Sequence, residues 1–453
     1  MKKSIYILVF ILLFLNSNAQ CWKLVEGAFQ HSIGLTVDGK LWGWGYNQYG
    51  QIGSPAGSSN NTPTQIGSAT SWDTFSSNYS HTLALRTTGR LWAFGRNNVG
   101  LFGNGTTTNS VTPLLIGTDT WKAVAAGTDH SLGIKTNGTL WGWGENSFGE
   151  VGDGTQTQRL VPVLVDSGNW KQIEAGLRRS VGIKVDGTLW AWGQATPTGS
   201  IPQVIDSNIP LQIGTDNNWK EVSINYEHVL AVKNNGTLWA WGLNYLGAIG
   251  NGSTNYVLNP VQIGTATNWK QAAAGRYNSL ALKTNGSLWA WGNNEDGQLG
   301  NGTQIDSLIP IQVGSLTNWD FVSASYSQSF AIKSNGNLWA WGNNNFGFLG
   351  NGTNTSSNIP VFVTCPTIIL SNETFENSNF SVFPNPTNDF ITIKSFFIDS
   401  IKQIKIIDVS GKVILNKQND FENINVLDLK SGLFFIEIKS ENEKTTYIKF
   451  IKH

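Results

Sequence analysis

Histidine is the residue type whose spacing in this chain first suggests chemistry. Four of the five histidines recur at intervals of 50, 49 and 98 residues, at His31, His81, His130 and His228. Imidazoles at regular spacing could hold a metal ion or act as general acids and bases. The equivalent place in three further segments holds Arg179, Asn278 and Gln328. Because these side chains also form hydrogen bonds, we interpret the position as a partner for turn hydrogen bonds and predict no metal site.

No other pattern in the chain predicts catalysis. No phosphate loop, nucleophile motif or paired-carboxylate motif stands out, so we expect neither a cofactor nor enzymatic activity. Lys plus Arg and Asp plus Glu balance at thirty each, and a neutral chain has no long-range attraction for nucleic acid or anionic lipid. Fifty glycines and twenty tryptophans favour an all-β protein of short strands and tight turns.

An internal repeat of about fifty residues organises most of the chain. Each repeat begins with a tryptophan, at Trp22, Trp72, Trp121, Trp170, Trp219, Trp269 and Trp319. About nineteen residues later comes LWxWG or a close variant, with its aromatic pair at Trp42 and Trp44, Trp92 and Phe94, Trp141 and Trp143, Trp190 and Trp192, Trp239 and Trp241, Trp289 and Trp291, and Trp339 and Trp341. These positions account for every tryptophan of the chain.

Each repeat contains four segments with the length and alternation of short strands. In the sixth repeat these are WKQAAAG from Trp269, SLALK, SLWAWG, and PVQIG from Pro260. Asn285-Gly286 between the second and third segments suits a two-residue hairpin, in which both residues need a positive φ. In LWAWG both tryptophans lie on one face and the small residues on the other. We therefore expect the large groups of one sheet to pack against the small groups of the next.

The third repeat shows the full pattern, AG-x-x-HSLGIK-TNG-TLWGWG-ENSFGEVGDGT, from Ala126. This sequence resembles the repeat of the regulator of chromosome condensation family, and the resemblance covers residues 22 to about 364. It implies a seven-bladed β-propeller. The fourth repeat departs from the pattern after Gly193, where QATPTGSIPQV lacks the usual asparagine and paired glycines. We expect a different loop there on an intact blade.

The propeller is predicted to close where its first and last strands meet. The chain enters at Trp22 and leaves after PVFVT, a type of segment that elsewhere precedes a repeat tryptophan. We therefore expect the last strand to complete the first blade. The two cysteines of the chain, Cys21 and Cys365, flank this seam. Aligned on an intact repeat they fall at Ser315 and Asn318, which places them within reach of a disulfide; the alternative is two free thiols.

The N-terminus is typical of a secretion signal. Lys2 and Lys3 precede an apolar stretch from Ile5 to Leu15, and Ser17-Asn18-Ala19 offers a small-x-small cleavage site. No later segment approaches the length of a membrane span. We assign residues 1–19 to a signal peptide, 20–365 to the propeller, 366–379 to a linker and 380–453 to a C-terminal domain.

The C-terminal domain differs in composition from the repeats, with no tryptophan and much isoleucine, lysine and asparagine. Short alternating segments from Ile391, Ile404, Phe434 and Tyr447 predict a small Ig-like β-sandwich. The domain resembles the type A sorting domain of the type IX secretion system, through Phe383, Pro384, Asn385 and Pro386, then Gly411 in DVSGK, Gly432 in LKSGLF, and the basic end from Lys449. The resemblance implies a partnership with that export machinery and a secreted or cell-surface protein. The alternative is an ordinary accessory sandwich.

The positions that vary between repeats are the candidates for binding. Two residues before each histidine equivalent stand Phe29, Tyr79, Thr128, Leu177, Tyr226, Arg276 and Tyr326. One such loop in each blade would bring all seven to one face, and aromatic residues and arginine are enriched in binding hot spots. A second variable set lies in the glycine-rich loops, at Tyr49, Phe148, Tyr245 and Phe346. Either set could instead plug the central channel or pack its own loops.

We therefore predict a binding protein that recognises an unknown protein or glycan through loops on one face. The resemblance offers a second hypothesis, guanine-nucleotide exchange on a small GTPase, which export and the uniform repeat lengths disfavour. A hydrolase or lyase on the propeller scaffold is the third hypothesis. The lack of clustered acids or bases within any repeat disfavours it.

Overall fold

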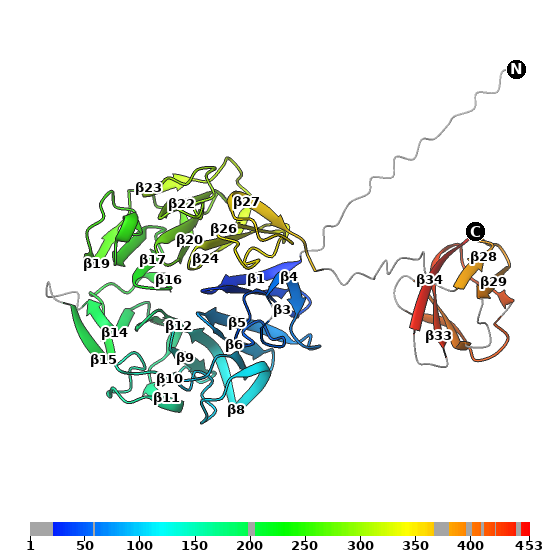
Figure 1. Cartoon of the computed structure of the whole chain (residues 1–453), viewed down its shortest axis with the longest axis horizontal. Coiled ribbons are helices and arrows are strands. Elements are labelled where there is room, and N and C mark those ends of the chain that lie inside the picture. Colours follow the sequence, from blue (N-terminus) through cyan, green and yellow to red (C-terminus); the bar gives the residue numbers. More distant parts are fainter. Residues whose placement is uncertain are drawn as a thin grey trace, which may run out of the picture. The chain divides into compact units, whose positions relative to one another are not determined.

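The computed structural model describes residues 21–57, 59–197, 204–366, 380–395, 401–408, 412–421, 423–440 and 445–453. The chain divides into two compact units, residues 1–366 and 367–453. The first unit is a β-propeller and the second a smaller unit of two sheets (Figure 1). The predicted signal peptide, most of the predicted linker, and Gly411 of the sorting motif lie outside the described residues.

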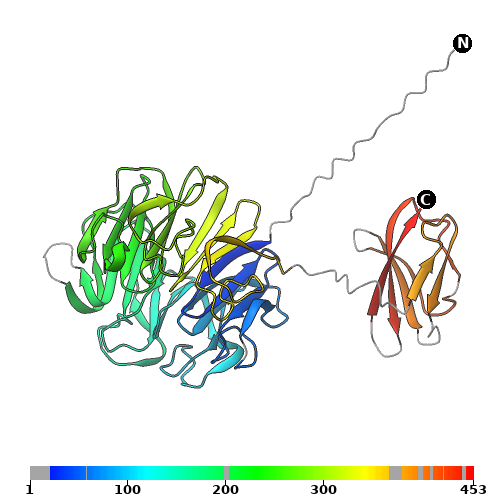
Figure 2. The same cartoon turned by 45° about the horizontal axis from the view of Figure 1, so that its top comes forward.

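Four strands follow one another from the centre of the propeller to its rim in each repeat, and we call these four strands a blade (Figures 1 and 2). The innermost strands are β1 (Trp22–Gly27), β5 (Trp72–Asn78), the end of β8 (Ser110–Ala126), β12 (Trp170–Ala175), β16 (Trp219–Ile224), β20 (Trp269–Ala274) and β24 (Trp319–Ala324). The second strands are β2 (His31–Thr36), β6 (His81–Arg86), β9 (His130–Lys135), β13 (Arg179–Lys184), β17 (His228–Lys233), β21 (Asn278–Lys283) and β25 (Gln328–Lys333).

The third strands contain the LWxWG sequence or its variant, and the outer strands follow the glycine-rich loops. The third strands are β3 (Leu41–Gly45), β7 (Arg90–Gly95), β10 (Leu140–Gly144), β14 (Leu189–Pro197), β18 (Leu238–Gly242), β22 (Leu288–Gly292) and β26 (Leu338–Gly342). The outer strands are β4 (Asn60–Gln65), the start of β8, β11 (Arg159–Asp166), β15 (Val204–Gln212), β19 (Val257–Gln262), β23 (Ser307–Gln312) and β27 (Ser357–Val363).

The sheets are antiparallel meanders. Five of them have four strands, and a seven-stranded sheet joins blades 2 and 3 because β8 runs unbroken from one into the other. Helical structure in the described residues is limited to a 3₁₀ turn at Tyr245–Gly247. The chain is therefore all-β, as predicted.

The prediction that the last strand completes the first blade is wrong. β27 pairs with β26 of its own repeat, and β4 completes the first blade by pairing with β3. The segment from Pro260 likewise lies in β19 of blade 5 and not in blade 6. Each blade is therefore contiguous in sequence, and its glycine-rich loop joins the third strand to the outer strand of the same blade.

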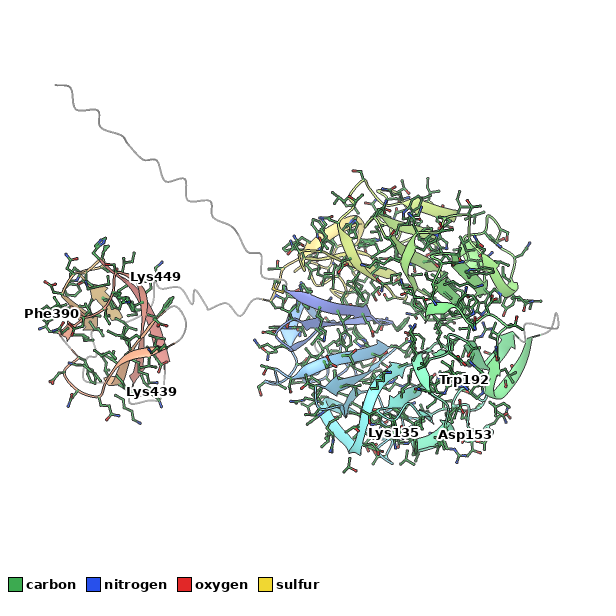
Figure 3. All side chains as sticks on the ribbon, turned by 180° about the vertical axis from the view of Figure 1, so that it is seen from behind. Lys135, Asp153, Trp192, Phe390, Lys439 and Lys449 are labelled. Atoms are coloured by element: carbon green, nitrogen blue, oxygen red, sulfur yellow. A yellow bond between two sulfur atoms is a disulfide. The ribbon has the colours of Figure 1, made fainter. Side chains whose placement is uncertain are left out.

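Tryptophans fill the spaces between blades. Within blade 4, the ring of Trp170 lies 5.8 Å from that of Trp192 and 6.3 Å from that of Trp190. Trp192 packs inside the propeller, whereas Asp153 lies toward its outer edge (Figure 3). At the junction of blades 6 and 7, Trp319 and Trp341 share a core cluster with Leu280 and Ala290. Large residues of one blade thus pack against aliphatic and small residues of its neighbour, which removes roughly 150–250 Å² per aromatic ring from water.

Hydrogen bonds tie each glycine-rich loop to the next blade. The carbonyl of Leu101 in blade 2 accepts from Trp143 Nε1 at 2.7 Å and from Ser131 Oγ at 2.9 Å, both in blade 3. The same pair of donors reaches the carbonyls of Phe348, Glu150, Ala248 and Gln298 at four other junctions. A buried carbonyl with two such donors is fully satisfied, so the loop is fixed against its neighbour.

Blades 4 and 5 depart from this rule together. The loop of the fourth repeat lacks the usual sequence, and β14 and β15 extend into it as a longer hairpin. In blade 5 the place of Ser131 is held by Val229, which has no hydroxyl to donate. The described residues contain no hydrogen bond from Trp241 to a loop carbonyl. This junction therefore lacks the serine donor, and its described residues lack the indole hydrogen bond as well.

The seam between blades 7 and 1 uses the ordinary junction contacts and adds a covalent bond. Trp22 N donates to Gly336 O at 3.1 Å. Each of the other repeat tryptophans makes the same backbone hydrogen bond to the hairpin glycine of the preceding blade. Cys21 and Cys365 form a disulfide with their Cα atoms 6.1 Å apart. This bond holds together the two ends of the propeller chain, which share no sheet.

The second unit consists of two antiparallel sheets around one core. Its strands are β28 (Phe380–Phe383), β29 (Phe390–Ser395), β30 (Ile401–Asp408), β31 (Val413–Lys417), β32 (Ile424–Asn425), β33 (Gly432–Ser440) and β34 (Thr445–Lys452). The sheet order is β28-β29-β32 in one and β31-β30-β33-β34 in the other. Ile391, Ile404, Ile436 and Phe450 are fully buried between them. The predicted sandwich architecture follows from these alternating isoleucines.

Removing the seam disulfide should destabilise the propeller. The bond closes a loop of 344 residues, so the Cys21→Ser and Cys365→Ser double variant should lose about 2–5 kcal/mol of unfolding free energy. Urea denaturation of oxidised parent and variant measures this difference. Equal stability of the two proteins would show that non-covalent contacts alone close the ring.

Removing one donor at a junction should have a smaller effect. Trp143→Phe deletes the bond to Leu101 O and part of a buried ring, so we expect a loss of about 1–3 kcal/mol of unfolding free energy. Trp241→Phe is the matched control, because it makes the same ring change at a junction without this bond. The control should lose clearly less; equal losses would assign the effect to packing alone.

Candidate functional site

The seven variable residues lie in the loops that join the first and second strands of each blade, such as the loop between β1 and β2. All seven loops are at the same end of the inner strands. Each residue lies within two residues of the end of its inner strand, as Phe29 does after β1 and Tyr326 after β24. Backbone hydrogen bonds link these loops from blade to blade: Leu177 N donates to Tyr226 O at 3.1 Å and Arg276 N to Ser325 O at 3.0 Å. The positions of the side chains are therefore set by the backbones of the blades that surround the propeller axis.

Five of these seven side chains touch one another across the loops. The Phe29 ring is stacked on Tyr79 with centroids 4.8 Å apart and meets Tyr326 edge-on at 4.4 Å. Tyr326 in turn lies 6.2 Å from Tyr226. The Arg276 guanidinium lies over the rings of Tyr326 and Tyr226 at 3.9 and 5.1 Å. We call Phe29, Tyr79, Tyr226, Arg276 and Tyr326 the aromatic cluster.

The two remaining predicted site residues do not join the cluster. Thr128 is buried, and its backbone N–H donates to Gly176 O at 3.1 Å. Leu177 is half-buried and has no ring to stack. The cluster therefore occupies blades 1, 2, 5, 6 and 7, whereas the smaller residues of blades 3 and 4 leave its opposite side less filled.

Arg276 is the charged member of the aromatic cluster. Its guanidinium also lies 4.5 Å from the ring of Tyr277, and its Nε is buried without a hydrogen-bond partner among the described residues. No ion pair joins Arg276 to a carboxylate in the described part of the chain. Cation–π contacts with three tyrosines hold the group in place but leave its charge unneutralised.

The second variable set extends the same face outward. The Tyr245 ring lies 4.8 Å from that of Tyr277, and Phe148 lies under the guanidinium of Arg178 at 4.5 Å. Tyr245 and Phe346 expose 53% and 42% of their surface, so they are available for contact. Tyr49 is half-buried in its loop. The glycine-rich loops thus surround the aromatic cluster instead of forming a separate site.

Buried asparagines hold these loops in shape, a role that the sequence interpretation missed. Asn146 Nδ2 donates to Thr155 O and Thr157 O, both at 3.1 Å, while its Oδ1 accepts from Val151 N at 2.9 Å. Asn97, Asn294 and Asn344 make the same bonds. The signal was present, since an asparagine follows the WG of six repeats by two positions.

The interpretation of the histidine position as a partner for hydrogen bonds of its own turn is wrong. The histidines form hydrogen bonds with serines of the next blade. His81 Nε2 lies 3.1 Å from Ser131 Oγ, His130 Nε2 lies 2.8 Å from Ser180 Oγ, and His228 Nε2 lies 2.9 Å from Ser279 Oγ. Each serine hydroxyl already donates its proton to a loop carbonyl. The imidazole must therefore donate from Nε2, which leaves Nδ1 unprotonated.

Burial controls the charge of these imidazoles. Desolvation lowers the pKa of His31, His81 and His130 to about 3 and that of His228 to about 4. All four are therefore neutral near pH 7. In the described ranges no group of three or more His, Cys, Asp or Glu residues has the arrangement of a metal site.

A polar cavity of about 190 Å³ lies between the inner strands, and the sequence interpretation did not find it. Its wall includes Glu26, Glu174 and Glu221. Glu26 Oε2 accepts from Ser77 N and Glu221 Oε1 from Ala272 N, each at 2.7 Å and each on the next blade. Desolvation raises the pKa of Glu26 to about 8 and the pKa values of Glu174 and Glu221 to about 7. Glu26 and Glu221 thus cap free N–H groups of the inner edge strands, whereas Glu174 Oε1 accepts from Gln172 Nε2 at 3.2 Å.

The sorting motif of the second unit packs against the last strand. Asn385 Nδ2 donates to Lys449 O at 3.1 Å, and its Oδ1 accepts from Ile451 N at 2.9 Å. Thr387 N donates to Ile451 O at 2.8 Å. The Pro384-to-Pro386 segment and the basic C-terminus therefore lie side by side, although about sixty residues separate them in sequence.

A sequence repeat of four-stranded blades around one axis defines the first unit as a β-propeller. The family model of the RCC1-like domain matches residues 117–377, more than half of the chain, and the chain belongs to this family. Models of the regulator of chromosome condensation (RCC1) repeat match residues 38–85 and 88–134. The model of the secretion system C-terminal sorting domain matches residues 381–453 and indicates type IX secretion.

Solved structures show the same fold. Human WBSCR16 is similar at a TM-score of 0.64 and 20% identity, over 72% of this chain and 94% of that one. Prp20p from Saccharomyces cerevisiae is similar at 0.64 and 19%, over 77% and 88%. The ultraviolet-B receptor UVR8 of Arabidopsis thaliana is 40% identical over 42 residues, which is 10% of its length. No helix in the described residues has the length and apolarity needed to cross a membrane.

The buried imidazoles should make the protein sensitive to acid. Their folded-state pKa values lie below the ordinary 6.5, so their contribution to stability is complete above pH 6.5 and is lost as the pH falls toward 3. We expect the unfolding free energy, from urea titrations between about pH 7 and 4, to fall less steeply in His130→Gln than in the parent. Gln328 shows that glutamine fits this position.

Glu26→Gln is the control for this measurement. The raised pKa of Glu26 means that its contribution is complete below 4.5 and is lost as the pH rises through 8, the opposite direction. Between about pH 7 and 4.5 the unfolding free energy of the control should fall more steeply than that of the parent, because the variant removes an opposing slope, and the control should lose part of the alkaline slope. An unchanged acid slope in His130→Gln would show that the imidazole is not a source of the acid sensitivity.

Proposed function

We propose that this protein is exported by type IX secretion and binds a macromolecular partner, a protein or a glycan, through the face that holds the aromatic cluster. The observation that supports this most directly is the cluster itself. Four aromatic rings and one arginine from five blades meet at one end of the propeller, and none of them is fully buried. Residues of these types, clustered and partly exposed, dominate the energetics of binding interfaces.

The charge state of Arg276 adds to the argument. A guanidinium held between tyrosine rings without a carboxylate can donate a bidentate pair of hydrogen bonds to an acidic group of a partner. The exposed Tyr245 and Phe346 provide further contact area around it. The surface therefore combines an arginine with aromatic contact area, and both residue types are enriched at binding interfaces.

The sorting domain supports a location outside the cell. Its match to residues 381–453 accounts for the second unit as an export signal, so the propeller is the part left to act after secretion. Secretion or display on the cell surface follows from this proposal.

Two alternative functions stay open. Prp20p is described as having binding properties to Gsp1p and histones, and guanine-nucleotide exchange is the family activity that the sequence suggested. A nucleotide-release assay tests that activity, and screens on polysaccharides test a hydrolase or lyase. No feature of the described residues favours either over binding.

The proposal predicts that changes on this face abolish capture of a partner. A variant with Arg276→Gln, Tyr245→Ser and Phe346→Ser should lose about 2 kcal/mol or more of binding free energy, because hot-spot residues contribute on that scale. Affinity capture from surface and culture extracts with the full chain as bait, followed by titration of the captured component, measures this loss.

The matched control changes exposed apolar residues at the other end of the strands. Val37 and Val185 follow β2 and β13 and expose 52% and 57% of their surface. Val37→Ser with Val185→Ser should bind like the parent. If this control loses the partner while the face variant keeps it, the aromatic cluster is not the binding site.

A further inference from the structure

A second place on the propeller is distinguished by a missing counter-ion. At the end of their second strands, three successive blades pair a lysine with an aspartate: Lys135 with Asp119 at 3.0 Å, Lys184 with Asp166 at 2.8 Å, and Lys233 with Asp216 at 2.6 Å. Each ammonium also lies over two tryptophan rings of its own blade. The lysine is thus placed by aromatic rings and neutralised by a carboxylate.

Blades 6 and 7 keep the lysine and lose the carboxylate. Asp216 stands three residues before its repeat tryptophan, and that place is held by Ala266 before blade 6 and Leu316 before blade 7. Lys283 and Lys333 form no ion pair among the described residues. Lys333 Nζ still lies 4.9 and 4.2 Å from the rings of Trp319 and Trp339. Partial burial lowers the pKa of both lysines.

Blade 7 differs from blade 6 in a second respect. In five blades the first tryptophan of LWxWG or its variant donates its indole N–H to a hydroxyl, as Trp289 does to Ser287 Oγ at 3.0 Å. Asn337 replaces that residue in blade 7, and Trp339 Nε1 is buried without a partner in the described part of the chain. Trp319 Nε1 is likewise unpartnered, and Trp319 is 5% exposed.

These groups line a cavity of about 310 Å³ between blades 6 and 7. Lys333, Trp319 and Trp339 form one part of its wall, and Lys333 is the charged residue among the lining groups. The aliphatic part of the wall comprises Val313, Leu316, Ile359 and Pro360. Gln328 begins β25 near the aromatic cluster and Lys333 ends it, so this cavity opens at the far end of that strand.

We propose that this cavity binds a carboxylate carried on an apolar group. The ligand carboxylate takes the place that Asp216 occupies in blade 5: it forms an ion pair with Lys333 and accepts the indole N–H of Trp339. Its apolar part lies against Leu316 and Ile359. The Lys333 ammonium covers one face of each tryptophan ring, so that face offers no stacking platform for a neutral sugar. This site is independent of the aromatic cluster.

The experiment titrates N-acetylleucine, hexanoate and N-acetylleucinamide into the full chain and follows binding by ligand-observed NMR. We expect at least one of the two acids to bind and the amide, which lacks the charge, to bind about tenfold more weakly or not at all. Leu316→Asp supplies an internal partner for Lys333 and should abolish binding of the acid. Lys333→Met should abolish it too. Binding of N-acetylleucine alone would indicate that the site takes the C-terminal carboxylate of a peptide. Binding of hexanoate alone would indicate that it takes the carboxylate of a fatty acid.

Blade 6 supplies matched controls at the equivalent positions. Ala266→Asp and Lys283→Met make the same changes beside an indole that already has a hydroxyl partner, and both should bind the acid like the parent. The proposal is overturned if neither acid binds, if acid and amide bind equally, or if Lys333→Met retains the acid. The downfield indole N–H signal of Trp339, assigned from its loss in Trp339→Phe, should also shift on adding the acid.

Discussion

The interaction on which the propeller depends is the buried hydrogen bond between a loop carbonyl of one blade and two donors of the next. A four-stranded sheet has two apolar faces and cannot bury either alone. Stacking the sheets around an axis buries both faces, but only if the polar backbone of the connecting loops is satisfied inside the stack. The serine hydroxyl and indole N–H that meet at Leu101 O and its equivalents meet this requirement, and the buried asparagines hold each carbonyl in place. His81, His130 and His228 then bond to the same serines, which explains why a residue suggestive of catalysis recurs with the blade.

Departures from the repeat are informative because the constraint is shared between neighbours. Where the loop sequence of the fourth repeat departs from the usual pattern, the fifth repeat has Val229 in place of a serine, so a changed loop faces a blade without the serine donor. At the seam, blades 7 and 1 contain the two ends of the propeller chain, so no continuous segment of chain leads from one to the other. The disulfide between Cys21 and Cys365 adds a covalent bond to the ordinary junction contacts there. Inside the channel, carboxyl and amide side chains cap the free edges of the inner strands, a burial that makes Glu26, Glu174 and Glu221 weak acids.

Both proposed binding sites lie at positions that the junctions leave free to vary. The loops after the inner strands end outside the stack, and there the repeat permits Phe29, Tyr79, Arg276 and Tyr326 to meet. The lysine of the second strands shows the same principle at the other end of the blade. Three blades neutralise it internally, and blade 7 leaves both Lys333 and the indole of Trp339 without partners beside a cavity. Both proposed sites therefore consist of groups whose partners the repeat does not supply.

The sequence alone determined the all-β class, the repeat, the strand segments and the packing of tryptophans against small residues, because these depend on local alternation and on a periodicity repeated seven times. It also identified the loops whose side chains gather at one end. Only the tertiary structure decided which strand closes which blade, since the outer segment before each tryptophan can pair with either of two repeats and the pattern is the same for both. The partners of His81 and His130, the carboxyl groups of the channel and the unpaired Lys333 were likewise beyond the sequence. The hydrogen bonds of the histidines and of Glu26 and Glu221 join residues about fifty positions apart, and periodicity shows that such positions are equivalent without showing which of them touch.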